Sequence, residues 1–194
     1  TDALVDDIKV SLDSERDSLK EPFFQKKYSR PIMLAVAIAA FNQLSGINAI
    51  LYYAPTIFRS AGFGEQAGLL NSVGLGLMNL VFTMIGLALI DHFGRKRLML
   101  IGSIGYIVSL GVAAAAFFTQ SQLVETEAGG VVREFTSQAG GYVVFASLLV
   151  FIASHAVGQG AVIWVFISEI FPNRLRARGQ ALGSFTHWIF AAGI

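Results

Sequence analysis

Residues 135–168 read FTSQAGGYVVFASLLVFIASHAVGQGAVIWVFIS and contain no Asp, Glu, Lys or Arg. The hydrocarbon core of a bilayer is about 30 Å thick, and roughly 20 apolar helical residues cross it. A charged side chain at its centre costs a few kcal/mol or more, so an uncharged run of this length is physical evidence. The stretch predicts a membrane-spanning helix at about 141–170.

The rest of the sequence contains four more uncharged stretches, at 31–58, 66–90, 98–124 and 179–194. They predict three complete spans and a fifth that is truncated by the end of the sequence, at about 31–58, 66–90, 98–118 and 179–194. The predicted fold is an all-α membrane protein: an incomplete helical bundle over 31–194, preceded by a separate segment over 1–30. We expect this bundle to lie within a lipid bilayer.

The composition is typical of a membrane protein and argues against several other classes of protein. The chain is 54% hydrophobic and 14% charged, whereas a soluble protein carries about 25% charged residues. A net charge of +1 gives no reason to expect nucleic acid, and the absence of cysteine excludes disulfide and thiolate chemistry. The sequence shows no nucleophile–base pair, metal-ligand cluster or phosphate-binding glycine loop, so we expect no enzyme, no metal and no cofactor.

Basic residues are distributed unevenly between the two sides of the predicted bundle. With alternating crossings, the side that holds residues 1–30 and the loops 91–97 and 169–178 carries 12 of the 14 Lys and Arg residues, and the other side carries Arg59 and Arg133. Cytoplasmic loops collect Lys and Arg. We therefore place residues 1–30 in the cytoplasm and predict a multi-pass integral protein of the plasma, or cytoplasmic, membrane.

Two segments outside the spans have their own patterns. Leu4, Ile8 and Leu12 recur at four-residue spacing and predict a cytoplasmic surface helix within 3–20. The polar outer loop at 119–138 is predicted to turn at Gly129-Gly130. The first residue is Thr1 rather than Met, and the sequence ends at Ile194 within an apolar run, so we expect a piece of a longer chain.

Uncharged polar side chains lie inside the predicted spans. The first span carries Asn42, Gln43 and Asn48 around Gly46. On an ideal helix Gln43 and Asn48 lie about 140° apart, so a break at Gly46 is needed to bring them together. Amides both donate and accept hydrogen bonds, as sugar hydroxyls do, and an indole such as that of Trp164 offers an apolar face to a sugar ring. The pattern predicts a cavity for an uncharged polyol.

Structural interpretations compete with this one. Asn and Gln also hold membrane helices together, at about 0.6 kcal/mol per hydrogen bond, and Trp residues also serve as interfacial anchors. His155 is interpreted as a helix–helix hydrogen-bonding group or, alternatively, as a proton relay. The basic loop residues Arg95 and Arg176 are interpreted either as topology signals or as members of ion pairs that change with conformation.

Four motifs, in this order and spacing, resemble the sugar porter family of the major facilitator superfamily. They are QLSGINAILYY at 43–53, DHFGRKR at 91–97, GQGAVIW at 158–164 followed by SEIFPNRLR at 168–176, and FTHW at 185–188. The resemblance covers essentially the whole chain. It implies the C-terminal half of that fold: the end of the central cytoplasmic domain, helices seven to ten, and part of helix eleven. The N-terminal half of the same chain, which the resemblance implies as the partner of this half, is then missing from the sequence.

The resemblance also implies roles for individual residues. The sugar-binding positions of the family match Asn42, Gln43, Asn48, Asn79, Trp164, His187 and Trp188. Its outer-gate tyrosines match Tyr52 and Tyr53. Its cytoplasmic ion-pair network, which latches the outward-facing state, matches Arg95, Glu169 and Arg176, with Asp91 beside them at the membrane edge.

The expected function is alternating-access transport of a monosaccharide, meaning a hexose, a pentose or a related polyol. No Asp or Glu lies within the spans, and the first helix, which carries the titrating carboxylate in proton symporters of the family, is not part of this sequence. Facilitated diffusion and proton symport therefore both stay open, and protons are a partner only in the second. The alternative from another class is a sugar sensor that has the same fold and transports nothing.

Overall fold

The computed structural model describes residues 5–6, 21–61, 63, 65–125 and 131–193. Most of the predicted surface helix within 3–20, and the Gly129-Gly130 turn, lie outside the described residues. The chain divides into two compact units, which are described separately below. Unit 1 comprises the described parts of 1–41 and 164–193, and unit 2 comprises those of 42–163.

The predicted spans are helical. The helices are α2 (Ser29–Leu44), α3 (Ile47–Ser60), α4 (Glu65–Phe93), α5 (Arg95–Gln120), α6 (Gln138–His155), the π-helix η2 (Ala156–Gly160), α7 (Val162–Glu169) and α8 (Arg176–Ala192). Two short 3₁₀ turns, η1 (Lys26–Tyr28) and η3 (Asn173–Leu175), precede α2 and α8. Within the described residues, 4 helical stretches are long and apolar enough to cross a membrane: Lys26–Ser60, Leu69–Phe93, Arg95–Gln120 and Gln138–Glu169.

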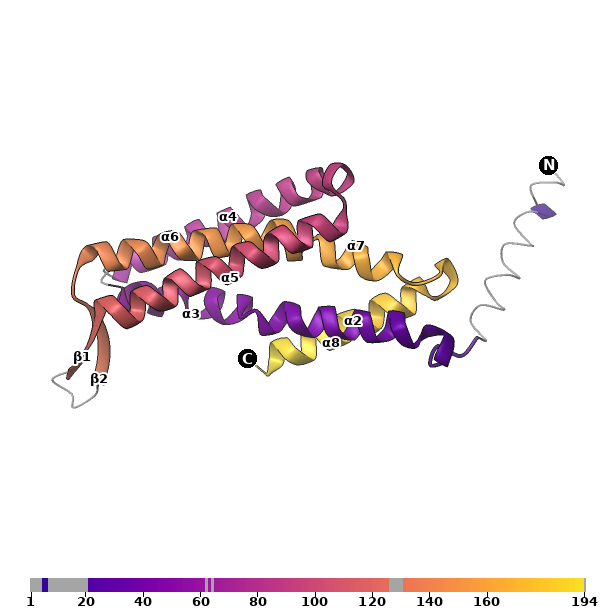
Figure 1. Ribbon diagram of the computed structural model, residues 1–194, viewed down its shortest axis with the longest axis horizontal. Helices are drawn as coiled ribbons and strands as arrows, with labels where there is room; N and C mark the ends of the chain where they lie inside the picture. The colour runs from indigo at the N-terminus through magenta and orange to yellow at the C-terminus, as the bar shows by residue number, and fades with distance from the viewer. Residues whose placement is uncertain (1–4, 7–20, 62, 64, 126–130, 194) are drawn as a thin grey trace. The chain divides into compact units, whose positions relative to one another are not determined.

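In unit 2, α4, α5 and α6 pack side by side, and α3 packs against α4 (Figure 1). A close backbone contact joins α5 to η2. A Cβ atom added to Gly102 would lie 2.6 Å from Gly158 Cα, and one added to Gly158 would lie 2.5 Å from Gly102 Cα. Two helices with glycine at their crossing can approach backbone to backbone. This contact fixes the position of the π-helix against α5.

Aromatic and aliphatic side chains fill the interior of unit 2. Phe58 and Phe151 are fully buried, and the Phe58 ring lies 5.5 Å from that of Phe145 in an edge-on arrangement. The rest of this buried cluster comes from α3, α4, α5 and α6: Ile47, Ala54, Leu75, Ala116, Val144, Leu148 and Ile152. Dispersion contacts and ring geometry of this kind hold membrane helices together where no hydrophobic driving force acts between them.

The predicted outer loop contains a hairpin that the sequence did not predict. Strand β1 (Ser121–Glu125) pairs antiparallel with β2 (Val131–Phe135), with Leu123 opposite Arg133. The Phe135 ring lies 4.9 Å from the ring of Phe117 on α5, and the Thr136 amide and hydroxyl both donate to the Gln120 carbonyl. These contacts anchor the hairpin to the end of α5.

Unit 1 packs around Phe171, between α7 and η3. The Phe171 ring stacks on Phe23 at 5.6 Å, and a Cβ atom on Gly179 of α8 would lie 2.2 Å from the Phe171 ring. Gln180 Nε2 donates to the Trp164 carbonyl at 2.7 Å. Helices α7 and α8 are thereby held together at the end where the intervening loop joins them.

Candidate functional site

The first span is broken at Gly46, between α2 and α3. Gly46 has φ 84°, a left-handed conformation that favours glycine. Across the break, Asn48 Nδ2 donates to Gln43 Oε1 at 2.9 Å. On an uninterrupted helix these two side chains would point in different directions, about 140° apart. The break therefore brings the two predicted amides into direct contact.

The amides beside the break are shielded from solvent. Gln43 is 1% exposed and Asn42 is 5% exposed. Ser45 Oγ donates to the Asn42 carbonyl at 2.6 Å, so the carbonyl beside the break has a partner. Asn48 and Asn79 are half-buried, and α4, which carries Asn79, packs against α3. Buried amides in a membrane span are costly unless they bond to protein, water or ligand.

The fourth span is interrupted at the π-helix η2, which contains Gly158 and Gly160. Gln159, inside this turn, donates from Nε2 to Ser103 Oγ at 3.0 Å and lies 3.5 Å from the Met99 carbonyl. A π-bulge of this kind frequently marks a functional site. The amide of Gln159 is nevertheless bonded to α5, which is the helix-joining role that competes with substrate binding.

His155, at the end of α6, is buried among aromatic rings. Its imidazole lies 6.0 Å from the Phe151 ring and 6.4 Å from the Tyr106 ring. These contacts favour a packing role for His155, and the proton-relay interpretation stays a prediction.

Three other predicted residues meet in unit 1. The Trp164 and His187 rings lie 5.0 Å apart, and the His187 and Trp188 rings lie 5.5 Å apart, both edge-on. The Trp188 side chain is 65% exposed. The site residues thus fall into an amide group in unit 2 and an aromatic group in unit 1. The predicted gate residues Tyr52 and Tyr53 on α3 are both exposed.

The predicted ion-pair residues lie at helix ends. Asp91 and Arg95 pair at 3.6 Å across Gly94, which has φ 78°. In unit 1, Arg176 Nη2 donates to Asn173 Oδ1 at 2.8 Å, and Glu169 is exposed at the end of α7. The structure shows the Asp91–Arg95 pair, whereas the wider network with Glu169 and Arg176 stays a prediction.

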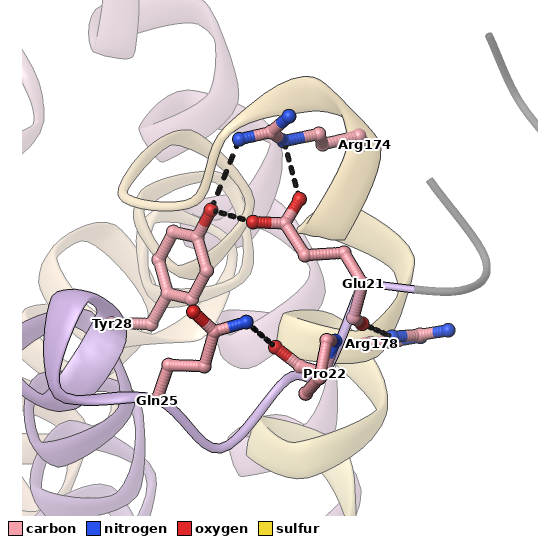
Figure 2. Close-up of polar contacts among 6 residues, drawn as sticks. All are labelled: Glu21, Pro22, Gln25, Tyr28, Arg174 and Arg178. Carbon is pink, nitrogen blue, oxygen red and sulfur yellow. Dashed lines mark hydrogen bonds and ion pairs between the residues drawn. The ribbon is translucent and has the colours of Figure 1, made fainter. Parts of the chain in front are cut away.

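A polar cluster in unit 1 was missed by the sequence analysis (Figure 2). Tyr28 Oη donates to Glu21 Oε1 at 2.7 Å, and Arg174 donates both to Glu21 Oε2 at 2.9 Å and to Tyr28 Oη at 3.1 Å. Arg178 Nη1 donates to the Glu21 carbonyl at 2.6 Å. The hydrogen bond to Tyr28, then the charge of Glu21, raise the pKa of the Arg174 guanidinium. We call Glu21, Tyr28, Arg174 and Arg178 the juxtamembrane clamp.

The hydroxyl group of Tyr28 is expected to stabilise the protein through the juxtamembrane clamp. Tyr28 is 2% exposed, and Tyr28→Phe removes its hydroxyl while keeping the ring. We expect the free energy of unfolding to fall by about 1–2 kcal/mol, because the lost bonds involve charged partners. Thermal unfolding of the full-length protein in detergent measures this. Tyr142→Phe is the matched control, because the Tyr142 ring is 59% exposed; equal effects of the two variants would contradict a structural role for the clamp.

Comparison of the sequence with known proteins identifies the family of the chain. The sequence model of the family described as "Sugar (and other) transporter" matches residues 1–194. The chain belongs to this family. It is 34% identical to the arabinose-proton symporter of Bacillus subtilis, over 93% of this chain and 35% of that protein. It is also 34% identical to the glucose facilitated diffusion protein of Zymomonas mobilis, over 81% of this chain and 30% of that protein.

Solved structures of sugar transporters share the fold. The crystal structure of a D-xylose-proton symporter superposes with a TM-score of 0.69 at 30% identity, covering 97% of this chain and 37% of that one. The inward-open xylose transporter of Escherichia coli gives a TM-score of 0.66 at 30% identity, covering 94% and 34%. The chain is thus an integral membrane protein with part of the major facilitator helical bundle, and it spans about a third of the length of these relatives.

Proposed function

We propose that the full-length protein transports a monosaccharide across the membrane by alternating access. The observation that carries the proposal is the amide pair at Gly46: the glycine breaks the span, and the break brings Asn48 to 2.9 Å from Gln43. A broken helix that presents hydrogen-bonding groups at membrane depth is the usual architecture of a transporter's substrate site. Neutral amides suit the hydroxyl groups of a sugar, which both donate and accept.

The relatives support the substrate class and leave the particular sugar open. Those named above are a symporter for arabinose, a facilitator for glucose and transporters for xylose. Amide and indole groups are chemically suited to a hexose, a pentose or a related polyol alike. Because both proton-coupled and uncoupled proteins are among these relatives, the proposal includes both modes.

Each predicted site residue has a role in this proposal. Gln43, Asn48 and Asn79 take the place of water at the sugar hydroxyls, with Asn42 beside them. Trp164 and Trp188 pack against the apolar edges of the ring, with His187 between them. Tyr52 and Tyr53 close the outer side, while ion pairs among Asp91, Arg95, Glu169 and Arg176 break and re-form as the bundle rocks.

Uptake of a labelled sugar tests the function. The full-length protein in proteoliposomes is expected to take up D-xylose, L-arabinose or D-glucose saturably, with competition by the unlabelled sugar. The 194-residue chain alone is expected to give no uptake, because it supplies one wall of the pathway. Saturable binding without uptake would support the alternative, a sugar sensor of the same fold; neither binding nor uptake of any of the three would contradict the proposed substrate class.

The buried histidine gives a second test. His155→Gln is expected to change proton-driven uptake less than twofold if the imidazole, which lies against the Phe151 and Tyr106 rings, has a packing role. The measurement is uptake by the full-length protein across an imposed pH gradient. Loss of gradient-driven uptake with intact sugar exchange would contradict the packing role and favour the relay.

A further inference from the structure

One face of α5 is exposed along most of its length. Its apolar members are between 54% and 65% exposed: Leu100, Ile101, Ile104, Ile107 and Val108. At 100° per residue they fall within an arc of about 140°. Lys96 and Arg97, both exposed, fall within the same arc one turn before Leu100. We call these seven residues the α5 face; all of them belong to unit 2.

Among the described residues, no hydrogen bond or ion pair involves the two cations on this face. Asp91, the nearest carboxylate along the chain, pairs with Arg95 at 3.6 Å. Neither the Asp91–Arg95 pair nor the Glu21–Arg174 pair includes Lys96 or Arg97. The remaining titratable group of the turn, His92, directs Nδ1 at the Ala88 carbonyl. The face therefore begins with two positive charges, at the predicted cytoplasmic end, and continues as apolar surface into the membrane.

We propose that the α5 face binds an anionic phospholipid of the cytoplasmic leaflet, with its phosphate at Lys96 and Arg97 and its acyl chains along Leu100, Ile104 and Ile107. The α5 face has cations at one end and apolar side chains beyond them, in the same order as the phosphate and acyl chains of such a lipid. Ile107 lies 11 residues beyond Lys96, so the apolar part reaches about 16 Å along the helix axis from that cation. One leaflet contributes about half of a hydrocarbon core of about 30 Å. A cationic pair at the headgroup level also attracts the negative cytoplasmic surface.

Lipid selectivity of the full-length protein tests this proposal. Spin-labelled phosphatidylglycerol and phosphatidylcholine, each in phosphatidylcholine bilayers, give the preference of the protein for the anionic lipid. Each cation near the surface contributes about fivefold to anionic lipid binding, the equivalent of about 1 kcal/mol. Lys96→Gln/Arg97→Gln is therefore expected to lower that preference by roughly 25-fold at the site, with an unchanged unfolding temperature.

Two further experiments distinguish a lipid site on the α5 face from general attraction by surface cations and from binding of free phosphate. Lys26→Gln/Lys27→Gln removes two other exposed cations of the predicted cytoplasmic side, which lie in unit 1, and is expected to lower the preference clearly less than Lys96→Gln/Arg97→Gln does. Excess inorganic phosphate at constant ionic strength is expected not to displace the labelled lipid, because the acyl chains contribute to binding. Equal losses in the two double variants, no loss in either, or displacement by phosphate would overturn the proposal.

Discussion

Gly158→Ala is expected to destabilise the full-length protein by roughly 3 kcal/mol or more, the largest effect that we predict on folding. The added Cβ would lie 2.5 Å from Gly102 Cα and 2.8 Å from the Leu98 carbonyl oxygen. Both neighbours are backbone atoms, so relief requires the π-helix to move away from α5. The unfolding temperature in detergent, together with the fraction of protein that stays monodisperse, measures the effect.

A matched glycine provides the control for this prediction. A Cβ on Gly111, also on α5, would meet nothing within 4 Å. Gly111→Ala is therefore expected to stabilise the protein slightly, by about 0.5–1 kcal/mol, through the better helix propensity of alanine. If Gly158→Ala and Gly111→Ala behaved alike, the close approach of η2 and α5 would be contradicted.

Gln43→Ala is expected to weaken sugar binding to the full-length protein by about 1–3 kcal/mol, which is roughly 5- to 150-fold in Kd. Gln43 is 1% exposed and accepts from Asn48 at 2.9 Å, so its removal leaves Asn48 without this partner and the sugar without an amide. Asn48→Ala is expected to have an effect of the same size. Titration calorimetry with the transported sugar gives both values.

Another glutamine at membrane depth separates binding from folding. Gln159 is 7% exposed, and its amide donates to Ser103 at 3.0 Å. Gln159→Leu is expected to lower the unfolding temperature while changing Kd less than twofold. The proposed site would be wrong if Gln43→Ala and Asn48→Ala both left the affinity unchanged, or if Gln159→Leu weakened it as much as they do.

Features of the fold that depend on local sequence were predictable. A charge-free run must be helical to cross a bilayer, because hydrocarbon offers no partner for free backbone groups. Glycine was the signal for the break in the first span, because Gly46 has the positive φ that favours glycine. Gly158 and Gly160 likewise lie in the π-helix that interrupts the fourth span. The contact between Gln43 and Asn48 agrees with the same reasoning, since Gly46 breaks the helix between them; their binding of a sugar stays a prediction.

Features that join distant parts of the chain were not predictable. The juxtamembrane clamp pairs Glu21 with Arg174. The sequence around each of these residues does not indicate which distant residue it will pair with. The contact between Gly102 and Gly158 depends on how two spans cross, which periodicity does not specify. The hairpin depends on Phe135 packing against Phe117 and on Thr136 bonding to Gln120. In each case tertiary contacts decide the outcome.

The position of a bound monosaccharide in a structure of the full-length protein tests the central claim most directly. We expect sugar hydroxyl oxygens within hydrogen-bonding distance, about 3.2 Å or less, of the Gln43 and Asn48 amides, with an indole of Trp164 or Trp188 against the ring. A sugar bound elsewhere, with these amides bonded only to neighbouring helices or directed at lipid, would contradict the account.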